Sequence, residues 1–176
     1  YGSPANMVDQ FLFADGTIWT SGEIDGRVRT FIGAGPDETF SGSTGDDTIR
    51  GMGGNDQIRA DAGNDVLDGG AGNDFLEGNS GNDLYVFGRG YGQDAIDEQG
   101  GSADIDTLQL IDGITPGDIT LQATPDFQTD ALLTIKNTAD QVILAGFFQS
   151  DGMRVDRIQF SDGTIWDYSA MLAHTE

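Results

Sequence analysis

Large apolar residues recur at every ninth position between residues 42 and 86, and glycine or polar residues fill most of the positions between them. These apolar residues are Ile49, Ile58, Leu67, Leu76 and Tyr85. Each is the middle one of three strand positions, where successive side chains point to opposite faces of a β-strand. The other six positions of each repeat are rich in glycine and polar residues, which favour turns. The pattern therefore predicts short strands joined by turns, with one apolar side chain per strand forming a thin core.

Every repeat also places an aspartate two residues before its apolar residue and a glycine two residues before that aspartate. The aspartates are Asp47, Asp56, Asp65, Asp74 and Asp83, the glycines are Gly45, Gly54, Gly63, Gly72 and Gly81, and the residues between them are Asp46, Asn55, Asn64, Asn73 and Asn82. A merely solvated acidic surface has no reason to keep glycines in step with carboxylates. Glycine adopts left-handed conformations readily, so carbonyl oxygens can turn toward a common point. We therefore expect each repeat to offer a carboxylate, together with carbonyl oxygens from the glycine and from the Asn or Asp after it.

Two repeats are predicted to form one coil of an all-β, parallel β-roll with two facing sheets. Coils stacked about 4.8 Å apart place Asp47, Asp65 and Asp83 on one edge, with Asp56 and Asp74 on the other. Carboxylates at that spacing repel by roughly 3 kcal/mol at an effective dielectric constant of about 20, and a cation between turns reverses the sign. All-oxygen ligation with several carbonyls suits Ca²⁺ better than Mg²⁺. Transition metals prefer imidazole or thiolate ligands. The sequence therefore predicts calcium.

The repeats weaken at both ends of this block. Within residues 33–41, Pro36 replaces the glycine and Glu38 replaces the aspartate, as expected of a terminal repeat. After Phe87 the period ends, but Asp94 and Asp106 still precede apolar runs and are expected to complete the last site of each row. Alternating segments then predict strands at Asp118–Gln122, Ala131–Lys136, Gln141–Ala145 and Arg154–Phe160, and a short helix at Tyr168–Ala173. We divide the chain into residues 1–32, the tail of a preceding module and a linker; residues 33–88, the β-roll; and residues 89–176, a β-rich cap.

Composition narrows the possible partners. Among 176 residues, 8 Lys and Arg stand against 30 Asp and Glu, for a formal net charge of −22. Such a chain repels nucleic acid and anionic membrane surfaces, and no apolar run is long enough to insert into a membrane. Cysteine is absent, which excludes disulfides and zinc thiolate sites. His174 has no nucleophile or base near it in a recognisable motif, so we expect no enzyme activity.

A longer duplication suggests a tandem architecture. VDQFLFADGTIW at Val8–Trp19 and VDRIQFSDGTIW at Val155–Trp166 are offset by 147 residues. We expect the chain to be part of a longer protein built from modules of about this length. The two equivalent tryptophans, Trp19 and Trp166, are interpreted as packing residues that close a module.

The repeats resemble the calcium-binding nonapeptides of the RTX, or haemolysin-type, family, whose pattern is G-G-x-G-x-D-x-U-x. GGAGNDFLE at Gly69–Glu77 matches every fixed position, whereas Ser43, Met52, Asn79 and the pair Ala60-Asp61 replace glycines elsewhere. The stretch after the repeats, from NDLYVFGRGYGQDAI to VDRIQFSDGTIW, also resembles the capping flank of haemolysin-type proteins. The resemblance implies type I secretion in an unfolded state, folding triggered by calcium outside the cell, and an extracellular or cell-surface location. The ligand pairs available in the repeats predict roughly four to seven calcium ions.

Two functions remain open on the sequence. The first is a calcium-stiffened structural unit that contacts neighbouring modules of a large secreted protein. The second is a glycan- or surface-binding adhesin module that uses aromatic residues, for which the candidates are Tyr91, Phe127, Phe147, Phe148 and Trp166. Outward strand positions at Val66, Phe75 and Leu84 are apolar, so we also expect Ala131–Phe148 or a neighbouring module to cover that face of the roll.

Overall fold

The computed structural model describes residues 10–12, 18–20, 29–101, 103–124, 129–149 and 152–175. Near the N-terminus, β1 (Gln10–Leu12) and β2 (Ile18–Thr20) pair as antiparallel strands, and the side chain of Trp19 lies outside the described part of the structure. From residue 29 onward, the described residues form two seven-stranded sheets. The expected all-β class is confirmed, with the helix α2 (Tyr168–Ala173) at its predicted position and the 3₁₀ helix η1 at Pro116–Asp118.

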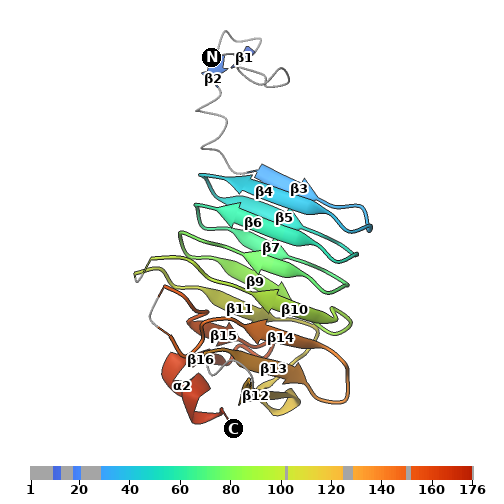
Figure 1. The fold of residues 1–176 in the computed structure, drawn as a ribbon, viewed down its shortest axis with the longest axis vertical. Coiled ribbons are helices and arrows are strands. Elements are labelled where there is room, and N and C mark those ends of the chain that lie inside the picture. Colours follow the sequence, from blue (N-terminus) through green and yellow to red (C-terminus); the bar gives the residue numbers. More distant parts are fainter. Residues whose placement is uncertain are drawn as a thin grey trace.

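The chain alternates between the two sheets as it winds from one end of the stack to the other (Figure 1). One sheet has the order β16 (Ile165–Asp167), β15 (Arg157–Gln159), β11 (Thr107–Leu110), β9 (Leu84–Phe87), β7 (Val66–Asp68), β5 (Asp47–Arg50) and β3 (Arg29–Ile32). The other has the order β12 (Ile119–Ala123), β13 (Ala131–Ile135), β14 (Gln141–Leu144), β10 (Gln93–Ile96), β8 (Phe75–Glu77), β6 (Gln57–Asp61) and β4 (Thr39–Ser43). From β3 to β9 each strand pairs in parallel with the strand two elements later, ending with β10 and β11, which is the predicted roll.

The core is the predicted single row of apolar side chains on each sheet. Ile49 pairs with Leu67, and Leu67 with Tyr85, while Ile58 pairs with Leu76 on the facing sheet. All five side chains are at most 1% exposed. Only β6 and β9 add a second buried apolar side chain, Ala60 and Phe87, so the repeat block holds a thin core that depends on its turns for further stabilisation.

The C-terminal flank extends both sheets instead of covering an outer face. β14 adds to β10 in parallel, and β15 adds to β11 in parallel. β13, β12 and β16 then continue the sheets as antiparallel strands. Two predicted strands begin later than expected. The strand predicted at Asp118–Gln122 begins at Ile119, because η1 occupies residues 116–118, and the strand predicted at Arg154–Phe160 begins at Arg157.

The expectation that Ala131–Phe148 covers the outward residues Val66, Phe75 and Leu84 was wrong. This segment supplies β13 and β14, which satisfy the hydrogen bonds of β10 and close the end of one sheet. The open end of a stack presents unpaired backbone groups and exposed core side chains. A segment that is added at this end therefore buries more of these groups than a segment that lies on the outer face. Val66 and Leu84 are half-buried, whereas Phe75 remains 38% exposed. Coverage by a neighbouring module stays a prediction.

Each repeat is counted from residue 42, 51, 60, 69 or 78. The second position of most repeats requires a left-handed backbone, whether or not the residue there is glycine. Gly70 has φ +87°, and the residues that replace glycine at this position, Met52, Asp61 and Asn79, have φ of 74°, 75° and 72°. Non-glycine residues pay a steric cost of about 1–2 kcal/mol in this region. The coil geometry therefore overrides local preference at these three positions. Ser43, by contrast, lies in β4 and needs no such turn.

Gly81 is expected to be one of the least replaceable turn glycines. A Cβ built there would lie 1.7 Å from the carbonyl oxygen of Gly63, and its φ is +124°. Gly81→Ala should therefore push successive coils apart and cost at least about 2 kcal/mol. Gly53→Ala is the matched control, since a Cβ there would meet nothing closer than 3.5 Å. Thermal unfolding in excess calcium checks the pair. Equal melting temperatures for the two variants would contradict this close-packed arrangement.

Candidate metal centre

The predicted aspartates form two rows, one along each edge of the roll. All five are buried, with exposed fractions between 1% and 3%. Within a row, each carboxylate is held by the coil before it. The backbone N–H of Asp47 donates to Oδ1 of Asp65 at 2.7 Å, and that of Asp65 donates to Oδ1 of Asp83 at 2.8 Å. On the other edge, Asp56 N–H donates to Oδ1 of Asp74 at 2.8 Å. The order along each edge is the predicted one.

Both rows continue beyond the last repeat. Asp74 N–H donates to Oδ1 of Asp94 at 3.0 Å, and Asp83 N–H donates to Oδ1 of Asp106 at 2.9 Å. The structure thus brings Asp94 and Asp106 into the rows, as expected. Asp106 N–H in turn donates to Oδ2 of Asp156 at 3.2 Å, directly before β15.

The second oxygen of most of these carboxylates is buried and has no hydrogen-bond donor among the described residues. This is true of Oδ2 in Asp56, Asp65, Asp74, Asp83, Asp94 and Asp106. Asp47 is the exception, because its Oδ2 accepts bonds from the backbone and side chain of Ser43 at 2.7 and 2.9 Å. A buried carboxylate oxygen without a donor costs free energy unless a cation satisfies it. These unsatisfied oxygens are therefore the atoms that fit a metal ion.

Glycines at the first position of the repeats keep space open beside those oxygens. A Cβ built on Gly51 would lie 2.1 Å from Oδ2 of Asp56 and 2.5 Å from the carbonyl oxygen of Gly69. A Cβ on Gly78 would lie 2.2 Å from Oδ2 of Asp83. Carboxylate and carbonyl oxygens thus face the same space, and such an all-oxygen set suits Ca²⁺. Sequence reasoning missed the first-position carbonyls, although the glycine at that position was a visible signal.

The Asn and Asp residues between each glycine and aspartate play a separate role through their side chains. All five are exposed, and each accepts a hydrogen bond from the backbone of the next coil on its own edge. Asn64 N–H donates to Oδ1 of Asp46 at 2.8 Å, and Asn82 N–H donates to Oδ1 of Asn64 at 3.0 Å. Asn55 and Asn73 do the same on the other edge. These outer rows fix the spacing of the turns. The carbonyl oxygens of Gly45, Gly54, Gly63 and Gly72 lie against the glycine of the next coil.

Burial sets the electrostatics of the rows. Burial first, and neighbouring carboxylates with it, raise the pKa of Asp65 and of Asp83 to about 7. The same causes raise the pKa of Asp94 to about 8 and that of Asp106 to about 7. Without a cation, the charged rows therefore oppose folding at neutral pH.

Acidification is expected to stabilise the calcium-free roll. Because the pKa values near 7 in the folded state exceed the unfolded value of 3.8, the folded chain binds more protons between these limits. The free energy of unfolding should therefore rise as the pH falls through about 7, and level off below about 4. With calcium bound, the free energy of unfolding should instead decrease as the pH falls, since protons compete with the ion for the same oxygens. Circular dichroism from about pH 8 to pH 5, with and without calcium, checks both slopes. A calcium-free chain that loses β structure on acidification would contradict the burial of these groups.

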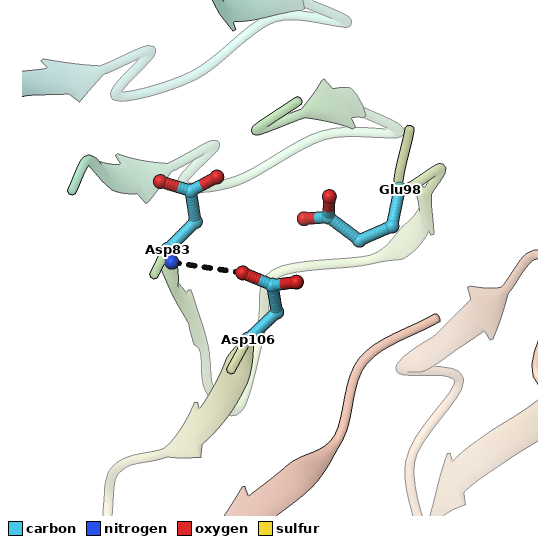
Figure 2. Close-up of side chains that lie close together, drawn as sticks. All are labelled: Asp83, Glu98 and Asp106. Atoms are coloured by element: carbon cyan, nitrogen blue, oxygen red, sulfur yellow. Dashed lines mark hydrogen bonds between the residues drawn. The ribbon is translucent and has the colours of Figure 1, made fainter. Parts of the chain in front are cut away.

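One group of three carboxylates lies at the end of a row (Figure 2). Asp83, Glu98 and Asp106 each offer an oxygen, and these oxygens lie within 4.8 Å of one another. Among the described residues this is the one group of three or more such side chains. Burial raises the pKa of Glu98 to about 9. Glu98 was not identified from the sequence.

Asp140 and Asp156 were also missed, although a signal for both exists. Each lies two residues before a buried apolar residue, Val142 and Ile158, as the repeat aspartates do. Asp140 accepts hydrogen bonds from the backbone of Gly90 and Gly92 at 3.0 and 3.1 Å. The flank therefore repeats the aspartate-before-strand pattern without the surrounding glycines.

The candidate aromatic residues lie mostly in packed positions. Phe147 is fully buried and meets Phe148 edge to face at a centroid distance of 4.9 Å. Trp166 is 9% exposed, packs on Phe160 and stacks on the ring of His174, in agreement with its predicted packing role. Tyr91 donates a hydrogen bond to Asp68 at 3.1 Å. Phe127 lies outside the described residues. No helix in the described part of the chain is long and apolar enough to cross a membrane.

Comparison with known proteins agrees with this geometry. A family model described as RTX calcium-binding nonapeptide repeat (4 copies) matches residues 32–67 and 60–93. A second, described as haemolysin-type calcium binding protein related domain, matches residues 132–170 in the flank. The iron-regulated protein FrpA of Neisseria meningitidis serogroup C is 35% identical over an alignment of 93 residues that covers 49% of this chain and 8% of that relative. This chain thus corresponds to a small part of that relative's length.

The repeats and the flank therefore confirm the predicted resemblance, and repeats of this kind bind Ca²⁺. The parallel strands of the repeat block form the predicted roll, and the two rows of buried aspartates lie along its edges. The chain therefore carries RTX calcium-binding nonapeptide repeats, folded as a parallel β-roll, and a β-rich C-terminal flank that matches the haemolysin-type calcium binding protein related domain.

Proposed function

We propose that the chain is a calcium-dependent folding unit of a large extracellular protein, with a structural and not a catalytic role. The observation that carries this proposal is the set of buried, unsatisfied carboxylate oxygens in the two rows. At neutral pH these groups oppose folding until a cation satisfies them. Calcium then decides whether the roll is stable.

The proposed ligands combine the two rows of carboxylates with backbone carbonyl oxygens. The carboxylates are those of Asp47, Asp56, Asp65, Asp74, Asp83, Asp94 and Asp106, and the carbonyls come from Gly45, Gly54, Gly63, Gly72 and Gly81 and from the Asn or Asp after each. The first-position carbonyls join this set, because those of Ala60 and Gly69 lie beside the carboxylates. Roughly four to seven ions would occupy the gaps.

The binding energy is large enough to act as a switch. Extracellular calcium modules bind at about 10⁻⁴–10⁻³ M. At tenfold above the dissociation constant each site adds about 1.4 kcal/mol, and five sites add about 7 kcal/mol. This equals the stability of an ordinary domain. Such a chain stays unfolded where calcium is scarce and folds where it is millimolar, which suits type I secretion and an extracellular location.

The alternative is an adhesin module that binds a glycan or a surface. Glycan platforms require exposed aromatic faces, whereas Phe147 and Trp166 are buried. This packing favours the structural role. Glycan binding that persists when the roll is disrupted by chelation would instead support the adhesin.

Counting the bound ions tests the proposal. Native mass spectrometry and isothermal titration calorimetry with CaCl₂ should give roughly four to seven ions per chain, with MgCl₂ binding weakly. Fewer than two calcium ions, or equal binding of magnesium, would contradict the proposal. The rows would then be an acidic surface that the flank holds in place.

A further inference from the structure

Glu98 occupies a position that is glycine or alanine in the earlier turns of the same edge. β8 and β10 pair with Leu76 opposite Ile96, and Asp97 N–H donates to the carbonyl of Leu76 at 3.0 Å. This register sets Glu98 level with Gly78. In the two coils before Gly78, the equivalent positions are held by Ala60 and Gly42. The last turn of this edge therefore places a carboxylate where the other turns leave space beside an aspartate.

Tyr85 fixes the orientation of Glu98. Its hydroxyl accepts a hydrogen bond from Gly78 N–H at 2.7 Å and donates to Oε1 of Glu98. Tyr85 is also the one polar side chain among the five core positions of the repeats. Glu98 is 0% exposed, and its Oε2 has no hydrogen-bond donor among the described residues. One oxygen of Glu98 is thus anchored, and the other is free to bind a ligand.

The free oxygens of three side chains converge. Asp83 and Asp106 each use Oδ1 to accept a backbone hydrogen bond, and Oδ2 of both is buried and unpartnered. Figure 2 shows their carboxylates and that of Glu98 facing a common space. The coil also lengthens here, from 18 residues between Asp65 and Asp83 to 23 between Asp83 and Asp106. A glutamate, with one methylene more than aspartate, suits this longer coil.

We propose that Asp83, Glu98 and Asp106 bind one calcium ion at the C-terminal end of this row, in a site that no nonapeptide specifies. Three buried carboxylates with free oxygens require a cation to compensate their charge. The site also joins the roll to the flank, because Asp106 N–H donates to Asp156 immediately before β15. It rests on the proposed function, in that it makes Glu98 the third carboxylate ligand of the last calcium ion in this row.

Replacement of Glu98 by glutamine tests this site in the full chain. Glu98→Gln keeps the size of the side chain and removes its charge. Native mass spectrometry and calorimetry with CaCl₂ should show one ion fewer than in the wild type at saturation. Glu77→Gln is the matched control, since Glu77 pairs with Arg59 on the outer face of the same sheet. It should bind the wild-type number of ions. An unchanged ion count and an unchanged isotherm for Glu98→Gln would overturn the proposal and make Glu98 a hydrogen-bonding core residue only.

Tyr85→Phe provides a second, independent variant. It retains the ring in the core and removes only the hydroxyl that anchors Glu98. One site should weaken by about tenfold or more, with the ion count at saturation unchanged. An isotherm that superimposes on the wild type would overturn the proposal, even if Glu98→Gln fails to fold. A wild-type chain that binds no calcium would refute the proposed function itself, whereas normal calcium-driven folding with an unaltered Glu98→Gln would refute this site alone.

Discussion

Replacing Asp65 with asparagine is expected to raise the calcium concentration needed for folding several-fold, while Asp61→Asn leaves it unchanged. Asp65 lies between Asp47 and Asp83 in its row, and its Oδ2 is buried and unsatisfied. The asparagine keeps an oxygen for the backbone of Asp47 but removes the charge. The control Asp61→Asn removes the same charge from an exposed side chain. Its left-handed backbone, with φ 75°, tolerates asparagine.

The expected size follows from the position of Asp65 in two successive gaps. If both ions are lost, the free energy of unfolding falls by about 3 kcal/mol at calcium tenfold above the dissociation constant. In a chelator at about pH 8 the sign should reverse, because the variant removes a buried charge that opposes folding. Denaturant unfolding in calcium measures the loss, and the β signal by circular dichroism in the chelator measures the reversed effect. Equal calcium dependence of Asp65→Asn and Asp61→Asn would mean that Oδ2 of Asp65 binds no ion.

A buried charge in the flank is expected to unfold the roll as well as the flank. Val142 in β14 is fully buried between Asp94 of β10 and Leu133 of β13. Val142→Asp therefore places an uncompensated charge at the junction, at a cost of roughly 4 kcal/mol. The neighbouring Ile143 is 40% exposed, so Ile143→Asp is a control on the same strand with the opposite orientation.

Calcium titration followed by circular dichroism distinguishes two outcomes for this pair. If flank and roll fold as one unit, Val142→Asp should shift the whole transition to much higher calcium, while Ile143→Asp follows the wild type. The reason is that β10 and β11 would otherwise end the stack with unpaired backbone groups. A variant that loses only part of its β signal, and keeps the calcium midpoint of the rest, would show that the roll folds without its flank.

The nine-residue pattern was sufficient to predict the roll, its core and the order of its aspartates. The pattern works because one strand and one turn fill each repeat, so position in the sequence fixes position in the coil. Asp94 and Asp106 were also predicted from their apolar neighbours, although their rows step by 20 and 23 residues instead of 18.

What the sequence could not provide was the register beyond the last repeat. Glu98 joins the row because the coil between Asp83 and Asp106 is longer than the others and because the hydroxyl of Tyr85 donates a hydrogen bond to it. Neither fact is visible in local periodicity. The placement of Ala131–Phe148 failed for a similar reason. Its alternating pattern fits a strand that covers a face as well as one that extends a sheet, and the open end of the stack decides between them.

Far-UV circular dichroism of the chain, titrated from excess chelator into millimolar CaCl₂, tests the central claim most directly. We expect little β structure in the chelator and a cooperative gain with calcium, because the ions compensate the buried carboxylates of both rows. MgCl₂ at the same concentration should produce little change. A chain that shows its full β signal in the chelator, or that folds equally well with magnesium, would contradict the claim that calcium controls folding.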